Sequence, residues 1–229
     1  MKIHRFIDSF DFSRKKIDIS GDTAHQMKNV LKLKKSETII LCDGKGMDAV
    51  ASITEIGKSS VSVIIDQVRE NDAEPKRLVT LYASVLKHDN FDLLIQKATE
   101  VGVSEIIPLI CDRTVKADIK LDRAMRIAKE AAELAGRGKV PIVRSPSRFT
   151  IALGNRDAAA VHHLFDVSGS ELRQDMTDLS PAAWIGPEGG WSEEELEEAK
   201  KAGLKIATLG PQTLRGETAA VVASYLLCH

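Results

Sequence analysis

Two similar units near the C-terminus, within residues 182–227, constrain the fold more than any other part of the chain. The apolar segment 182–185 has the length and character of a buried strand and runs into the glycine-rich turn GPEGG at 186–190. The apolar segment 204–209 runs into Gly210-Pro211 and then into LRGETA at 214–219. Each turn therefore lies at the carboxyl end of a predicted strand, where open α/β sheets bind ligands.

The residues after each turn predict a helix. Ser192 stands three residues before Glu195, a capping box that predicts a helix to about residue 201, ended by Gly203. The last predicted helix, 218–227, is apolar almost all round and must be covered on more than one side. Glycines in the turn 186–190 permit close backbone approach, so this turn can present N–H groups to a ligand.

Strands and helices alternate through the preceding part of the chain. We expect strands at 78–86, 103–109, 140–143 and 158–165, and helices at 90–101, 121–135 and after Ser147. Strands separated by helices predict a parallel sheet with crossover connections, the α/β class.

The N-terminal part has a different pattern, with short strands at 38–42, 49–56 and 60–65. One helix, 23–33, is predicted among them with Asp22 as its N-cap. Along that helix and just past its end, His25, Lys28, Lys32 and Lys35 follow spacings of three and four and share one stripe. The stripe is either a solvated face or a set of phosphate contacts. The polar segment 69–77 predicts a boundary between domains 1–72 and 73–229.

Charge, cysteine content and apolar runs limit the kinds of binding site that the chain can carry. The formal net charge is −1, and residues 1–72 hold 12 Lys/Arg and 11 Asp/Glu, so a nucleic-acid site must be a local patch. Three separated cysteines without a CxxC pair disfavour structural zinc and disulfides and favour a reducing cytoplasm. No uncharged apolar run approaches the ~20 residues of a membrane helix. We expect a cytoplasmic protein that needs no metal and binds no membrane.

The two C-terminal motifs, IGPEGGWSEEE and LGPQTLRGETA, resemble the signature of the bacterial 16S rRNA (uracil-N3) methyltransferases. That family belongs to the SPOUT class. The resemblance implies a knotted SPOUT α/β domain (a trefoil knot) at 73–229, preceded by a PUA-like, RNA-binding β-barrel at 1–72. It also implies S-adenosyl-L-methionine as cofactor, a homodimer, and methylation of N3 of a decoding-centre uridine in 16S rRNA of the small ribosomal subunit.

The resemblance transfers site residues to matching positions. Cofactor contacts, mainly through backbone groups, are expected at Gly186, Pro187, Glu188, Gly189, Gly190, Leu209, Gly210, Leu214, Glu217, Thr218 and Ala219. Arg215 is the candidate catalytic residue, because a cation beside a uracil oxygen favours the ring anion. The alternative for Arg215 is a structural ion pair with Glu217 or Glu188. The candidate RNA contacts are His25, Lys28, Lys32 and Lys35, with Arg113, Arg123, Arg126 and Arg137 in the second domain.

Other functions fit the residues less well. A nicotinamide enzyme would carry GxGxxG after its first strand, and a nucleotide hydrolase would carry GxxxxGK[ST]. His162 and His163 point to opposite faces of a strand and disfavour a shared metal site. Two alternatives remain: a SPOUT enzyme acting on another nucleotide or on a ribose 2′-hydroxyl, and a non-catalytic RNA-binding protein on the same fold.

Overall fold

The computed structural model describes residues 3–87, 89–115, 118–172 and 180–229. It divides into two compact units. The N-terminal unit comprises Met1–Glu74 and Ala132–Val140, and the second unit comprises Pro75–Ala131 and Pro141–His229. The last residues of helix α3 (Leu121–Ala135) are therefore counted with the N-terminal unit.

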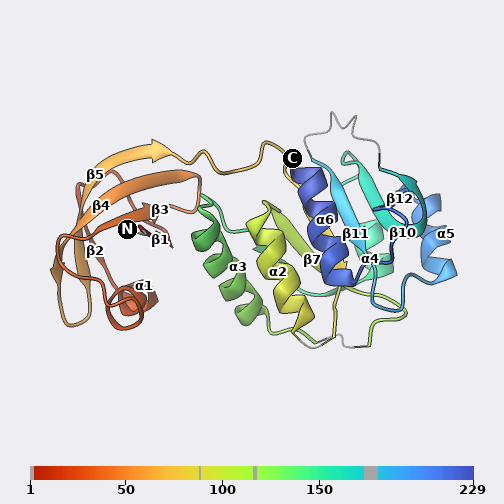
Figure 1. Ribbon diagram of the computed structural model, residues 1–229, viewed down its shortest axis with the longest axis horizontal. Coiled ribbons are helices and arrows are strands. Elements are labelled where there is room, and N and C mark those ends of the chain that lie inside the picture. Colours follow the sequence, from red (N-terminus) through yellow and green to blue (C-terminus); the bar gives the residue numbers. More distant parts are fainter. Residues whose placement is uncertain (1–2, 88, 116–117, 173–179) are drawn as a thin grey trace. The chain divides into compact units, whose positions relative to one another are not determined.

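A five-stranded sheet forms the N-terminal unit. Its strands are β1 (His4–Ile7), β2 (Lys16–Ile19), β3 (Thr38–Cys42), β4 (Met47–Ile56) and β5 (Val61–Glu70), in the order β1-β3-β4-β5-β2. The pair β1/β3 is parallel and the other pairs are antiparallel. In a flat sheet the edge strands would lie four spacings of about 4.8 Å apart. Phe6 of β1 and Ile19 of β2 nevertheless share one core, so the sheet curls into a partly open barrel (Figure 1).

The helix of this unit is shorter than the predicted 23–33, and that prediction is wrong at both ends. It starts with α1 (Gly21–His25) after the N-cap Ser20, so Asp22 lies in the first turn. It continues as a π-helical turn, η1 (Gln26–Val30), and ends at Leu31. Lys32 then takes a left-handed φ of +53°. The wider turn lets Leu33 fold back into the core, and it removes Lys32 and Lys35 from any helical stripe.

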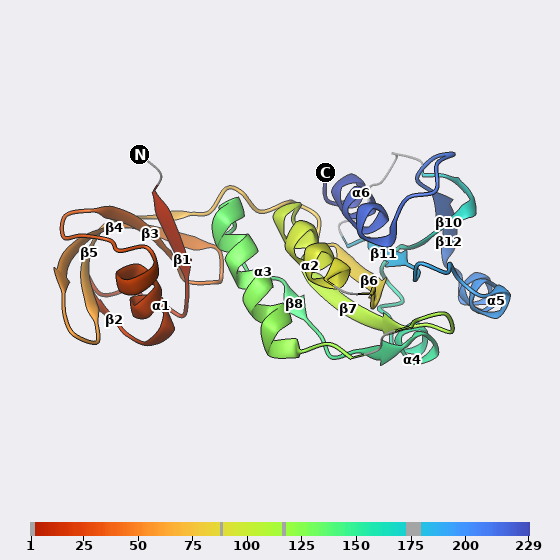
Figure 2. The same cartoon turned by 60° about the horizontal axis from the view of Figure 1, so that its bottom comes forward.

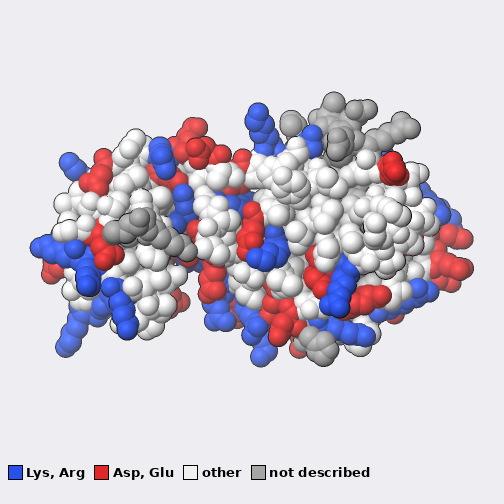
Figure 3. All heavy atoms as spheres, viewed as in Figure 1, with Lys and Arg blue, Asp and Glu red and all other residues white. Residues whose placement is uncertain are grey.

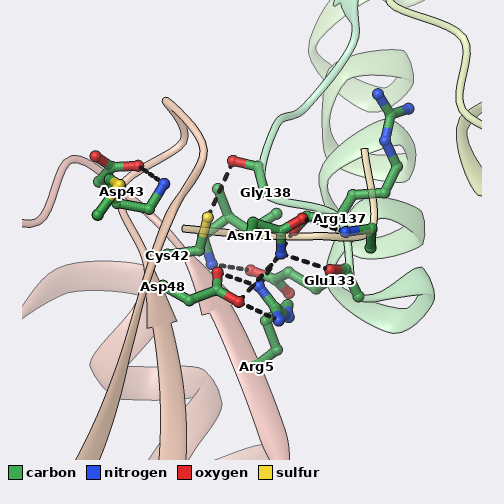
Figure 4. A network of polar contacts seen from close by, with 12 residues as sticks. Arg5, Cys42, Asp43, Asp48, Asn71, Glu133, Arg137 and Gly138 are labelled. Atoms are coloured by element: carbon green, nitrogen blue, oxygen red, sulfur yellow. Dashed lines mark hydrogen bonds and ion pairs between the residues drawn. The ribbon is translucent and has the colours of Figure 1, made fainter. Parts of the chain in front are cut away.

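Buried polar contacts attach the segment 132–140 to the sheet (Figure 4). The Asp48 carboxylate is 2% exposed and accepts from Arg5 Nη2 at 2.7 Å and from Asn71 Nδ2 at 3.1 Å. The same Asn71 amide donates to the carbonyl of Gly136 at 3.0 Å. A buried charge is costly unless it is paired and hydrogen-bonded. For Asp48, Arg5 supplies the ion pair and Asn71 supplies a further hydrogen bond. The segment 132–140 thus completes the polar interior of the N-terminal unit.

A parallel sheet forms the second unit, in the order β12-β10-β11-β6-β7-β8, with β9 also paired to β7. Its strands are β6 (Thr80–Ser84), β7 (Glu105–Ile110), β8 (Ile142–Val143), β9 (Ser147–Arg148), β10 (His162–Glu171), β11 (Ala182–Ile185) and β12 (Lys205–Thr208). Helices α2 (Asn90–Glu100) and α6 (Gly216–Cys228) lie side by side over one face of the sheet. Helices α4 (Phe149–Gly154) and α5 (Glu193–Lys201) cover the other face (Figure 2).

These elements confirm the predicted α/β alternation and parallel sheet. Strand β11 and helix α3 occupy the predicted residues, and the capping box of α5 is present in both directions. Glu195 N donates to Ser192 Oγ at 3.2 Å, and Ser192 N donates to Glu195 Oε2 at 2.9 Å. All four residues of β11 are buried, which explains its uninterrupted apolar sequence at the centre of a parallel sheet.

The route of the chain after β12 brings the two C-terminal motifs together. Strand β12 lies at one edge of the sheet, whereas α6 packs against α2 and β11 near the middle. The connecting residues 209–215 must therefore return past the carboxyl ends of β10 and β11. Across the described ranges, no helix is long and apolar enough to cross a membrane.

Candidate active site

A cavity of about 630 Å³ lies at the carboxyl ends of β10, β11 and β12, entirely within the second unit. This volume is typical of sites that enclose a small molecule. The lining residues come from three C-terminal segments and the start of α2. They are Asn90, Phe165, Asp166, Val167, Ile185, Gly186, Pro187, Glu188, Gly189, Gly190, Trp191, Thr208, Leu209, Gln212, Thr213, Leu214, Arg215, Gly216, Glu217 and Ala219.

The cavity brings together most of the residues predicted to contact the cofactor. The whole glycine turn, residues 186–190, lines it, as do Leu209, Leu214, Glu217 and Ala219. Gly210 and Thr218 belong to the same segments but do not line it. The two motifs, separated in sequence, thus line one cavity.

Glycine is needed at three points around the cavity. A Cβ at Gly186 would lie 3.0 Å from the Trp191 ring, and a Cβ at Gly216 would lie 2.8 Å from Leu86 Cδ2. Gly190 has φ of +73°, a conformation that side-chain-bearing residues rarely adopt. Side chains at these positions would displace the walls or strain the backbone.

Three neighbouring segments hold the glycine turn. Arg113 Nη1 donates to the carbonyl oxygen of Gly189 at 2.9 Å. The Glu188 carboxylate accepts from the backbone N–H of Lys87 at 2.8 Å. Trp191 Nε1 donates to the carbonyl of Phe165 at 3.0 Å. These contacts to three other segments therefore fix the position of the turn.

The residue before Arg113 is fixed to the cap of α5. Asp112 Oδ2 accepts from Ser192 Oγ at 2.6 Å, and Asp112 N donates to Glu195 Oε1 at 3.0 Å. Glu195 is 4% exposed. The capping box thus closes a helix end and also fixes the segment from which Arg113 reaches the glycine turn.

Arg215 occupies the N-cap position of α6 and its exposed side chain lines the cavity. Within the part of the chain that the structure describes, Arg215 forms no ion pair with Glu188, Glu217 or another acid. The alternative of a structural ion pair is therefore not found. The guanidinium is available to a ligand.

Several lining residues were not predicted from the sequence. Residues 165–167 lie where β10 meets the same edge of the sheet as β11 and β12. The rule that parallel strands end at one edge could have indicated them, but β10 was expected to stop at residue 165. Asn90 has no local signal, because only the packing of α2 against α6 brings it to the cavity.

The four candidate RNA contacts of the N-terminal unit occupy one short segment. His25, Lys32 and Lys35 are exposed, and Lys28 is half-buried with its ammonium donating to the carbonyl of Lys58. Figure 3 shows several Lys and Arg side chains gathered on this unit in the region of α1, whereas positive and negative side chains alternate over the second unit.

The arginine candidates differ in their surroundings. Arg113 supports the glycine turn, Arg123 pairs with Asp92 at 2.7 Å, and Arg126 is exposed. Arg137 is 3% exposed and its guanidinium pairs with Glu74 at 2.9 Å. The structure places Arg137 in the interior of the N-terminal unit, so we remove it from the candidate RNA contacts.

Two buried cysteines are unsuited to nucleophilic chemistry. Burial raises the pKa of Cys111 to about 12 and the pKa of Cys42 to about 11. Only the thiolate is a strong nucleophile, so both groups are inert at neutral pH. Neither cysteine lines the cavity.

Comparison with known proteins gives consistent similarities. Residues 73–227 match the family described as RNA methyltransferase domain, and residues 19–66 match the RNA methyltransferase PUA domain. The chain is 30% identical to the ribosomal RNA small subunit methyltransferase E of Rickettsia conorii over 97% of this chain and 94% of that protein. It is 31% identical to the protein of the same name from Bacillus subtilis, over 90% and 86%.

Solved structures agree in fold over the full length. A ribosomal RNA small subunit methyltransferase E from Neisseria gonorrhoeae, bound to S-adenosyl methionine, superposes with a TM-score of 0.91 at 30% identity, covering 97% of this chain and 95% of that one. A methyltransferase from Legionella pneumophila, also in complex with this cofactor, gives a TM-score of 0.90 at 26% identity, with 99% and 97% covered.

Proposed function

Since the chain belongs to the RNA methyltransferase family that includes the small-subunit ribosomal RNA methyltransferases, we propose that it methylates N3 of a specific uridine in 16S rRNA, with S-adenosyl-L-methionine as the methyl donor. The observation that carries this proposal is the single cavity formed by the glycine turn 186–190 and the segment 208–219. We assign residues 73–229 to the knotted SPOUT methyltransferase domain and residues 1–72 to a PUA-like RNA-binding domain.

The cavity fits the cofactor. Its volume suits a ligand of this size, and the glycine turn 186–190 offers bare backbone along its wall. The glycine turn, Leu209, Leu214 and the first turn of α6 would hold the cofactor. When bound, it supplies a methyl group activated by a sulfonium.

Arg215 would act on the uracil. The imide N3 becomes a good nucleophile only when its proton leaves, and the resulting negative charge is shared with the two ring oxygens. A guanidinium beside one of these oxygens stabilises the anion and lowers the pKa of N3. Alignment of base and methyl within the cavity can lower the barrier by a further ~7–11 kcal/mol.

Exposed side chains of α6 support a homodimer formed by the second unit. Tyr225 is 55% exposed and Leu226 is 37% exposed, although both lie on a helix that is apolar almost all round. A second copy would cover the apolar side chains. The whole protein would act in the cytoplasm, where its rRNA substrate is found.

Nucleoside mass spectrometry of 16S rRNA from a deletion strain tests the function. We expect 3-methyluridine to disappear and to return with the wild-type gene. Arg215→Ala should fail to restore it while cofactor affinity stays within a few-fold. Arg148→Ala is the control, an exposed arginine that does not line the cavity. Persistence of 3-methyluridine in the deletion strain, or loss of a 2′-O-methyl nucleoside instead, contradicts the proposal.

A further inference from the structure

Three carboxylates line the cavity, and only two of them have partners among the described residues. Asp166 Oδ1 accepts from the backbone N–H and the hydroxyl of Ser168, at 2.9 Å and 2.6 Å. Glu188 accepts from the backbone of Lys87. Glu217 makes no hydrogen bond or ion pair with any described residue, although it is only 9% exposed.

No described residue pairs with Glu217, and its carboxylate oxygens are reached from the cavity. Buried carboxylates are normally hydrogen-bonded or paired, because removing them from water is costly. Glu217 lies in the first turn of α6, where the helix dipole favours an anion by only about 0.3–1 kcal/mol at exposed sites. The nearest cationic residue in sequence, Arg215, does not pair with it. A ligand with N–H or O–H groups could donate the hydrogen bonds that the Glu217 oxygens do not receive from the described residues.

This inference rests on the proposed function, because it takes S-adenosyl-L-methionine as the ligand. That molecule carries two cationic groups, an α-ammonium and a sulfonium. A carboxylate needs hydrogen-bond donors, and the ammonium has three N–H groups whereas the sulfonium has none. We propose that Glu217 binds the α-ammonium of the cofactor's amino-acid part and so selects ligands that contain this part.

The role predicts a specific pattern of affinities. Both the methyl donor and its product, S-adenosylhomocysteine, contain the ammonium, whereas only the donor contains the sulfonium. 5′-Methylthioadenosine contains the adenosine and thioether but lacks the whole amino-acid part. A residue that recognises the ammonium affects the first two ligands equally and the third not at all.

Isothermal titration calorimetry of the full-length protein with these three ligands tests the proposal. Glu217→Gln keeps the size of the side chain and removes its charge. We expect it to weaken the donor and the product by a similar factor of about ten or more, the range for hydrogen bonds to charged groups. Affinity for 5′-methylthioadenosine should stay within about twofold. Glu194→Gln, on the exposed first turn of α5, is the matched control and should change nothing.

Each other outcome overturns the proposal in a recognisable way. An effect on the donor alone would assign Glu217 to the sulfonium. Equal weakening of all three ligands would mean that Glu217 shapes the cavity without recognising the ammonium. Unchanged affinities would mean that Glu217 contacts no ligand. Failure of the wild-type protein to bind the donor would instead contradict the proposed function itself.

Discussion

Arg113 Nη1 lies 2.9 Å from the carbonyl oxygen of Gly189, so the segment after β7 directly supports the turn that walls the cavity. Its aliphatic stem packs on the same residue, since a Cβ at Gly189 would lie 3.3 Å from Arg113 Cβ. Arg113 was predicted as an RNA contact. The contacts seen here indicate in addition a role in positioning the glycine turn.

Arg113→Ala should weaken cofactor binding. Loss of one partly exposed hydrogen bond and its packing should lower affinity about three- to tenfold, as measured by calorimetry. Arg113→Lys should recover part of the loss, because the ammonium can still donate to the carbonyl. Arg126→Ala, an exposed arginine for which no ion pair is found in the described chain, is the control. Unchanged cofactor affinity with weakened RNA binding would leave Arg113 as an RNA contact only.

Gly190→Ala should reduce cofactor affinity more than Gly189→Ala. Gly190 has φ of +73°, where a side chain costs roughly 1–2 kcal/mol, whereas Gly189 does not have a positive φ. The turn would relax and alter the cavity wall. Gly154→Ala at the end of α4 is the control, because its Cβ would meet no atom within 4 Å. Calorimetry would give the cofactor affinity of the three variants and thermal melts their stability, and so show whether backbone conformation or side-chain bulk causes the loss. A larger loss of affinity in Gly189→Ala would contradict this prediction.

The sequence predicted features that depend on neighbouring residues. It did not predict features that depend on packing between distant segments. The capping box Ser192–Glu195 and the apolar strand β11 depend on neighbours in sequence, and both are present as predicted. The helix at 23–33 had the right periodicity, but burying Leu33 required a π-helical turn that no local pattern encodes. Arg137 looked like a surface cation because its partner, Glu74, is distant in sequence.

His162 makes the stability of the second unit sensitive to pH. Trp184 Nε1 donates to His162 Nδ1 at 3.0 Å, and His162 Nε2 lies 2.7 Å from the carbonyl of Asp157, so these bonds assign the neutral ring with its proton on Nε2. Burial, the largest cause, lowers the pKa of His162 in the folded protein. The unfolded chain therefore binds this proton first, and stability is lost as pH falls below about 6.5 towards the folded pKa.

Urea unfolding between pH 8 and pH 5 would measure this effect. We expect the free energy of unfolding to be constant above about pH 7 and to fall below it by up to about 1.4 kcal/mol per pH unit for this one group. His162→Gln should be less stable at pH 8, because the pairing with Trp184 changes, and should show a flatter profile below pH 7. Parallel profiles for the two proteins would assign the acid sensitivity to other histidines.

Replacing Lys28, Lys32 and Lys35 would test whether this segment binds the RNA. The structure removes their common helical stripe but leaves them in one short segment, with Lys32 and Lys35 exposed and Lys28 half-buried. Phosphate contacts release counterions, so each lost contact makes the salt dependence of binding shallower by about 0.7–0.9 in the log–log slope. Changing all three to glutamine should weaken RNA binding and reduce the slope by roughly two, with cofactor affinity unchanged.

The triple variant should keep its fold, because glutamine and lysine have similar helix propensities at position 28, which lies in η1, and the buried Met27 and Leu33 are untouched. At Lys32, glutamine tolerates the left-handed φ about as well as lysine, so backbone strain is unchanged. Lys200, Lys201 and Lys205 are exposed on the second unit, and their triple change to glutamine is the matched control. Titrations with 16S rRNA at several salt concentrations compare the three proteins. Equal slopes for wild type and the 28/32/35 variant would mean that this face is only solvated, and that Arg113, Arg123 and Arg126 of the second unit hold the RNA.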